Sequence, residues 1–136
     1  MDTLQIASSR INLSVNGDEN RLISFDPEDI VFVTGFYQLA GAFAQKEEEY
    51  RTKVECLDPG DPKSAQKAAD LAVELLHWLR EEIDRLFGAG TSLAAFGEGG
   101  SPLMLRQFFE GVTPYIRSVR EQKVSRYTTD GDGALQ

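Results

Sequence analysis

The chain has 136 residues, a length that suits one domain with its own hydrophobic core. Its formal net charge is −8, so most of its surface should repel nucleic acid and anionic membranes. No apolar run approaches the roughly 20 residues of a membrane-spanning helix, and we expect no secretory signal. The single cysteine, Cys56, cannot form an internal disulfide, which fits a reducing compartment. We therefore expect a cytoplasmic protein that binds neither nucleic acid nor membrane.

The N-terminal part is predicted to be a flexible segment followed by a β-hairpin. Residues 1–10 show no periodicity, whereas apolar and polar residues alternate over 11–15 and again over 21–25. Asn16-Gly17 lies between these segments, and both residues tolerate the positive φ angles of a tight hairpin turn. Because an isolated hairpin is marginal in water, its apolar face should pack on helices.

Three long helices are predicted to follow, over residues 27–56, 63–87 and 102–124. Asp26 and Pro27 are typical of a helix start, and Ser101 is a cap for the last helix. The expected fold is mostly α: a bundle of three main helices with an N-terminal β-hairpin, forming one domain over 11–124. Residues 125–136 are expected to be a disordered tail. The apolar stripe predicted for the second helix is Ala65, Ala69, Ala72, Leu76, Leu79, Ile83 and Leu86.

The sequence indicates no catalytic residue, no metal ligand and no cofactor site. His77 is the only histidine, and no other residue completes a metal site around it. Cys56 lies near a helix C-terminus, where the helix dipole disfavours a thiolate. The glycine-rich segment 97–100 lacks the lysine of a phosphate-binding loop and is interpreted as a connector. The acidic residues Glu81, Glu82 and Asp84 are interpreted as part of a solvated helix face.

Aromatic residues on the first and third long helices instead indicate a protein-binding surface. A helix presents a limited face to its own core, and both helices carry more aromatic residues than one buried stripe needs. We therefore expect that Phe32 with Phe36, or Phe108 with Phe109, cannot all be buried unless self-association covers them. Cations at the end of the last helix suit an acidic partner segment, although the helix dipole also accounts for them. The candidate protein-binding residues are Phe32, Phe36, Tyr37, Phe108, Phe109, Arg117 and Arg120.

Several segments resemble a known family in their order along the chain. SFDPEDIVFVTGFY at 24–37 leads to KEEEY at 46–50, and WLREEIDRLFG at 78–88 is followed by AFG at 95–97. This order resembles small tail-region proteins from tailed phages and prophages of Gram-positive bacteria, and in size and acidity it resembles the tail assembly chaperones. The resemblance, which covers 11–124, implies a non-enzymatic factor that binds the tape-measure protein and helps to recruit tail-tube subunits. It implies no catalytic residues.

Two other functions and one competing use of the surface remain open. An acidic phage regulatory or anti-defence protein could inhibit a host factor by protein–protein binding, and a structural component would remain in the virion. Neighbouring tail-tube and tape-measure genes would support the chaperone. Self-association into a homo-oligomer would use the same aromatic surface, with the basic end of the last helix meeting the acidic run 47–49 of a neighbour.

Overall fold

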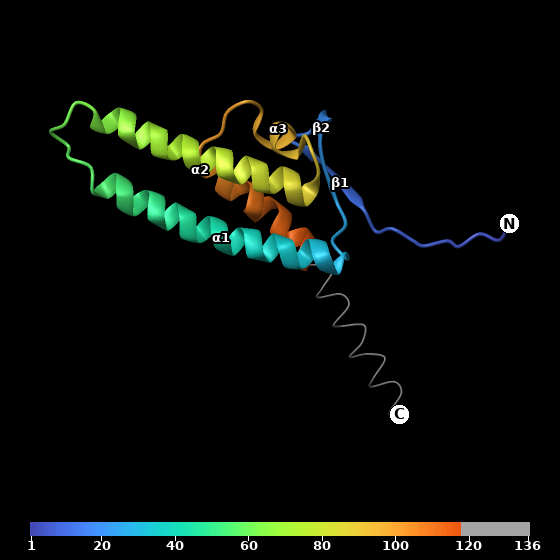
Figure 1. Ribbon diagram of the computed structural model, residues 1–136. Coiled ribbons are helices and arrows are strands. Elements are labelled where there is room, and N and C mark those ends of the chain that lie inside the picture. The colour runs from blue at the N-terminus through green and yellow to red at the C-terminus, as the bar shows by residue number, and fades with distance from the viewer. Residues whose placement is uncertain (118–136) are drawn as a thin grey trace.

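The computed structural model describes residues 1–117, so the predicted tail, the predicted end of the last helix and Arg120 lie outside the described part. Within it, four helices and an antiparallel hairpin confirm the mostly helical class with an N-terminal β-hairpin. Helices α1 (Ile30–Glu55) and α2 (Ser64–Phe87) form a long antiparallel pair (Figure 1). The hairpin and the short helix α3 (Thr91–Phe96) lie at one end of this pair. No helix within residues 1–117 is long and apolar enough to cross a membrane.

The hairpin forms where the Asn-Gly signal predicts it. Strand β1 spans Ile11–Val15 and strand β2 spans Asp18–Phe25, and the turn residues Asn16 and Gly17 have φ angles of 54° and 77°. These two positive angles match the right-handed twist of the flanking strands. The register pairs residue 11 with 25 and residue 13 with 23, and it shifts between residues 14 and 15. The apolar face of β2, formed by Ile23 and Phe25, is buried against the helices.

Helix α1 begins later than predicted, because a different aspartate caps it. The carboxylate of Asp29 accepts hydrogen bonds from the backbone N–H groups of Val31 (2.9 Å) and Phe32 (3.3 Å). The predicted cap, Asp26, instead accepts the N–H of Glu28 at 2.9 Å and closes a turn around Pro27. The segment from 26 to 29 is therefore a turn followed by a cap, and it redirects the chain from the hairpin into α1.

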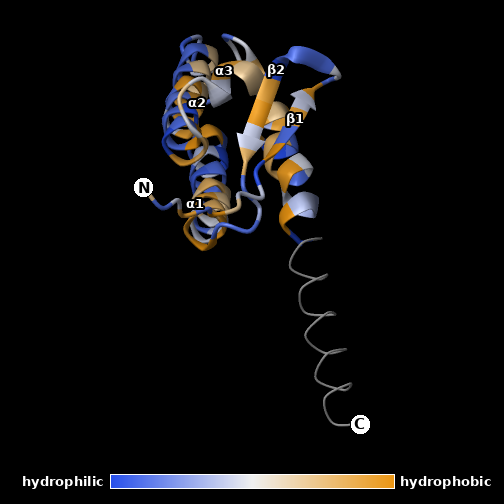
Figure 2. Ribbon diagram, turned by 90° about the vertical axis from the view of Figure 1, so that its right-hand side faces the viewer, coloured by the Kyte–Doolittle hydropathy of each residue, from blue (hydrophilic) through white to orange (hydrophobic). Residues whose placement is uncertain are grey.

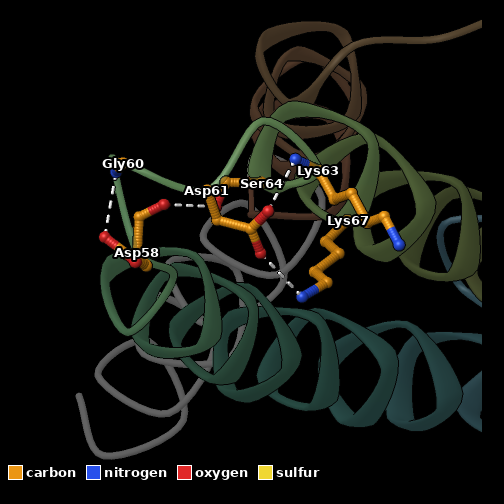
Figure 3. Close-up of polar contacts among 6 residues, drawn as sticks. All are labelled: Asp58, Gly60, Asp61, Lys63, Ser64 and Lys67. Atoms are coloured by element: carbon orange, nitrogen blue, oxygen red, sulfur yellow. Dashed lines mark hydrogen bonds and ion pairs between the residues drawn. The ribbon is translucent and has the colours of Figure 1, made fainter.

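The turn between α1 and α2 is held by the side chains of two aspartates (Figure 3). The carboxylate of Asp58 accepts the N–H of Gly60 at 2.9 Å, and the backbone carbonyl of Asp58 accepts a hydrogen bond from the Ser64 hydroxyl. The carboxylate of Asp61 accepts the N–H of Lys63 at 2.9 Å and pairs with the Lys67 ammonium at 3.2 Å. These bonds satisfy polar groups at the start of α2, for which Lys63 provides no side-chain cap.

The last described helix, residues 102–117, packs against the α1–α2 pair (Figure 1). It begins at the predicted cap, where the Ser101 hydroxyl accepts the N–H of Met104 at 3.2 Å. One continuous cluster joins all these elements. Its buried apolar residues are Ile23, Phe25, Phe32, Phe36, Leu39, Phe43, Leu75, Leu79, Ile83, Phe87, Phe96, Leu105, Phe108, Phe109, Val112 and Ile116.

The stripe predicted for the second helix is correct at its centre and wrong at its edges. Leu79 and Ile83 are fully buried, but the buried positions beside them are Leu75 and Phe87 rather than Leu76 and Leu86. The predicted alanine stripe is also mostly outside the core, since residues 65 and 69 are exposed and residue 72 is half-buried. The reason is that the last described helix, residues 102–117, and the hairpin cover only the second half of α2.

Asp84 is part of a structural contact and not of a solvated face. Its two carboxylate oxygens accept hydrogen bonds from the backbone N–H (2.8 Å) and the hydroxyl (3.0 Å) of Ser92, which is only 3% exposed. On the opposite side, the guanidinium of Arg21 donates to the carbonyl oxygens of Ala94 (2.9 Å) and Ala95 (3.0 Å). Short helix α3 is thus held at its start by α2 and at its end by β2.

Replacing this carboxylate should destabilise the protein. Asp84→Ala is expected to lower the free energy of unfolding by about 2 kcal/mol, because it leaves the buried Ser92 groups without their charged acceptor. Urea unfolding measures the change. Glu81→Ala, at an exposed position on the same helix, is the matched control and should change stability by less than about 0.5 kcal/mol. Equal effects of the two substitutions would contradict the structural role of Asp84.

Candidate protein-binding groove

The expectation that Phe32 with Phe36, or Phe108 with Phe109, cannot all be buried within one chain is wrong. Phe32, Phe36, Phe108 and Phe109 are 7%, 0%, 7% and 8% exposed. The physical reason is that each long helix meets several neighbours at the hairpin end, so its buried face is wider than one stripe. Phe109 shows this, since its ring centroid lies 5.7 Å from that of Phe36 and 5.2 Å from that of Phe43. These aromatic residues hold the fold together.

Two of the remaining candidate residues, Tyr37 and Arg117, lie at the surface. Tyr37 is 39% exposed, with its ring edge-to-face against Phe36 at 5.8 Å, and Arg117 is exposed. Arg120 lies outside the described residues. The acidic run expected to attract a neighbour's basic helix end is partly engaged within the chain. Glu47 is 17% exposed and lies between Arg51 at 3.6 Å and Arg106 at 3.8 Å.

The surface that suits a partner best is a groove between the hairpin and the last described helix. Its volume is about 540 Å³. In Figure 2, β1 is the strand of the hairpin farther from α2, and the helix that leads into the grey trace runs beside it. The lining residues are Asn12, Leu13, Ser14, Val15, Asn16, Ile23, Ala95, Phe96, Met104, Gln107, Phe108, Gly111, Val112 and Tyr115.

One wall of the groove is the edge of β1. The groove is lined by four residues of β1, Asn12 to Val15, and by the turn residue Asn16. Because consecutive residues of a strand point to opposite faces, a lining that includes consecutive strand residues reaches the edge of β1. The sheet has two strands, and within residues 1–117 no strand pairs with the other edge of β1. Such an edge offers backbone N–H and C=O groups to an added strand.

The opposite wall is the helix 102–117, and it leaves the groove open because a glycine lies in the middle of this helix. Gly111 lies within the helix 102–117, where glycine is about 1 kcal/mol less favourable than alanine. A Cβ atom at this position would meet nothing within 4 Å, so the glycine is not required for close packing. Its effect is to leave space between Gln107 and Tyr115, which line the groove one helical turn to either side.

The chemistry of the groove differs from that of the rest of the chain. Charged residues make up 26% of the sequence, yet none of the fourteen described residues that line the groove is charged. Its walls combine apolar side chains with the amides of Asn12, Asn16 and Gln107. An uncharged, partly apolar peptide segment is the ligand that such walls fit.

The residues weighed for catalysis or metal binding do not converge on a second site. His77 and Cys56 are both exposed. Among residues 1–117, no three His, Cys, Asp or Glu side chains lie close enough to hold a metal ion together.

The sequence interpretation missed the groove because its walls lie far apart along the chain. The signal that could have indicated it was Gly111, an unexplained glycine inside a strongly helical pattern.

Comparison of the chain with known protein families, curated proteins and solved structures identified no relative. No family model matches the chain, and neither a curated protein nor a solved structure matches it significantly.

Proposed function

We propose that this protein is a non-enzymatic tail assembly chaperone of a phage or prophage, acting in the cytoplasm of the infected or lysogenic bacterium. In this proposal it binds the tape-measure protein and helps to recruit tail-tube subunits. The observation that carries the binding function is the open, uncharged groove beside an unpaired strand edge in a strongly acidic chain. The resemblance of segments 24–37 and 78–88 to phage tail-region proteins supports the choice of partner.

The groove favours an extended partner segment over a helical one. Backbone groups at the edge of β1 can bond to a chain in the β conformation, whereas a helix uses its own backbone groups internally. Apolar side chains of the segment would then rest on Val112, Phe108 and Tyr115 of the last helix. The net charge of −8 would keep the loaded complex soluble and separate from other complexes.

Filling the groove tests this function without disturbing the core. Gly111→Leu places a side chain in the empty space, and Gly41→Leu is the matched control, because Gly41 is also an exposed glycine inside a helix with nothing within 4 Å of its Cβ position. Each variant is co-expressed with fragments of the tape-measure protein encoded beside the gene, and the captured fragment is measured. We expect Gly111→Leu to reduce capture at least about tenfold, a change of about 1.4 kcal/mol, and Gly41→Leu to capture as wild type does.

Two outcomes would contradict the proposal. Equal capture by both variants would show that the groove is not the binding site, and absence of capture by the wild type would overturn the chaperone function. Mass spectrometry of purified virions provides a separate check, since a chaperone should be absent from the finished tail and a structural component should be present.

A further inference from the structure

The N-terminal arm, defined here as residues 1–10, exposes apolar side chains that no other part of residues 1–117 covers. Every residue of the arm is exposed, and Leu4 and Ile6 are 84% and 83% exposed. These two residues lie two positions apart, so in an extended chain they point to the same side. From Thr3 to Ser9 the arm contains no charged residue, no glycine and no proline. It can therefore pair with a sheet edge without burying a charge and without a glycine or proline that would interrupt the strand.

The root of the arm is fixed so that the arm points away from its own groove. Arg10 donates from Nε to the Ser24 hydroxyl at 2.7 Å and from Nη2 to the Ser24 carbonyl at 3.2 Å, and the Ser9 hydroxyl donates to Glu28. Figure 1 shows the arm leaving the body at the start of β1. The groove runs along β1 in the opposite direction, from Asn12 to Asn16. To enter it, the arm would have to reverse direction at the residues that these bonds hold.

We infer that the arm of one copy binds in the groove of a second copy, as a strand added to the free edge of β1. Strand β1, which has five residues, and the five arm residues 3–7 have the same extended length, about 17 Å at roughly 3.3 Å per residue. Leu4 and Ile6 would lie on the apolar floor of the groove, and the added strand would pair with the β1 edge. Neither surface carries a charge, so the acidic chains do not repel each other at this contact. The inference rests on the proposed function only in treating the same groove as a peptide-binding site.

The oligomeric state of the full chain tests this exchange. Sedimentation velocity over a range of protein concentrations should show wild type with the mass of two or more copies. The double variant Leu4→Ser/Ile6→Ser, which impairs the arm, and Gly111→Leu, which fills the groove, should each sediment as one copy. The controls are Thr3→Ser/Gln5→Ser, on the other side of the arm, and Gly41→Leu, and both should associate as wild type does. Circular dichroism confirms that each variant is folded.

Mixing the two impaired variants gives the sharper result. The Leu4→Ser/Ile6→Ser variant keeps an open groove, and Gly111→Leu keeps an intact arm, so together they should form a complex of one copy of each. A wild type that stays a single copy at every concentration would overturn the inference, as would association that survives in both impaired variants. The assay contains no tape-measure fragment, so its failure leaves the capture experiment with Gly111→Leu to decide the proposed function by itself.

Discussion

Phe36→Ala is expected to lower the free energy of unfolding by about 3–5 kcal/mol, which is a large fraction of the stability of a typical domain. The side chain is fully buried. Its ring lies 5.7 Å from Phe109 of the last helix, and 6.3 Å from both Phe87 of α2 and Phe32 of α1, measured between ring centroids. Removing it leaves a cavity where three helices meet, and aromatic partners that cannot all move to fill it.

Urea unfolding followed by circular dichroism measures this change. Tyr37→Ala is the matched control, since Tyr37 is the next residue and is 39% exposed, and it should cost less than about 1.5 kcal/mol. A loss below about 1 kcal/mol for Phe36→Ala would contradict the burial of this ring. The result also bears on binding assays. Polar substitutions at the buried phenylalanines would unfold the protein, so loss of binding in such variants would say nothing about an interface.

Leu79→Ala should have the second largest effect, a loss of about 2–5 kcal/mol. Leu79 is fully buried at the centre of the core face of α2, between Leu75 and Ile83 along the helix. Truncation removes its contacts with the rest of the cluster and leaves a void in close-packed surroundings. The size of the loss within this range depends on how far the neighbouring side chains can collapse into the void.

The control for Leu79 lies three residues earlier on the same helix. Leu76 is half-buried, so Leu76→Ala should cost clearly less in the same urea titration. Equal losses at the two positions, or a larger loss at Leu76, would mean that the core face of α2 is centred as the sequence pattern predicted and not as the structure places it.

Local sequence determined the features whose partners are close along the chain. The Asn16-Gly17 turn formed as predicted because only two residues need positive φ angles there. Ser101 caps the last helix because its hydroxyl accepts an N–H three residues away. The start of α1 was predicted at the wrong residue because Asp26 and Asp29 are both suitable caps, and only the path of the chain out of the hairpin selects Asp29.

Tertiary structure alone decided which apolar residues are buried and where the surface is open. Leu75 and Leu76 are equally apolar, and the position of the neighbouring elements decides which of them enters the core. The sequence predicts a protein-binding surface from the number of aromatic residues on two helices, because periodicity describes one helix at a time. Burial depends instead on how many neighbours each helix has in the folded chain. The groove unites residues 12–16 with residues 104–115, and such a distant pairing leaves no periodic trace in the sequence. The sequence shows a glycine at position 111 inside a helical pattern. Only the tertiary structure shows that the open space at Gly111 lies beside the unpaired edge of β1 and so forms a groove.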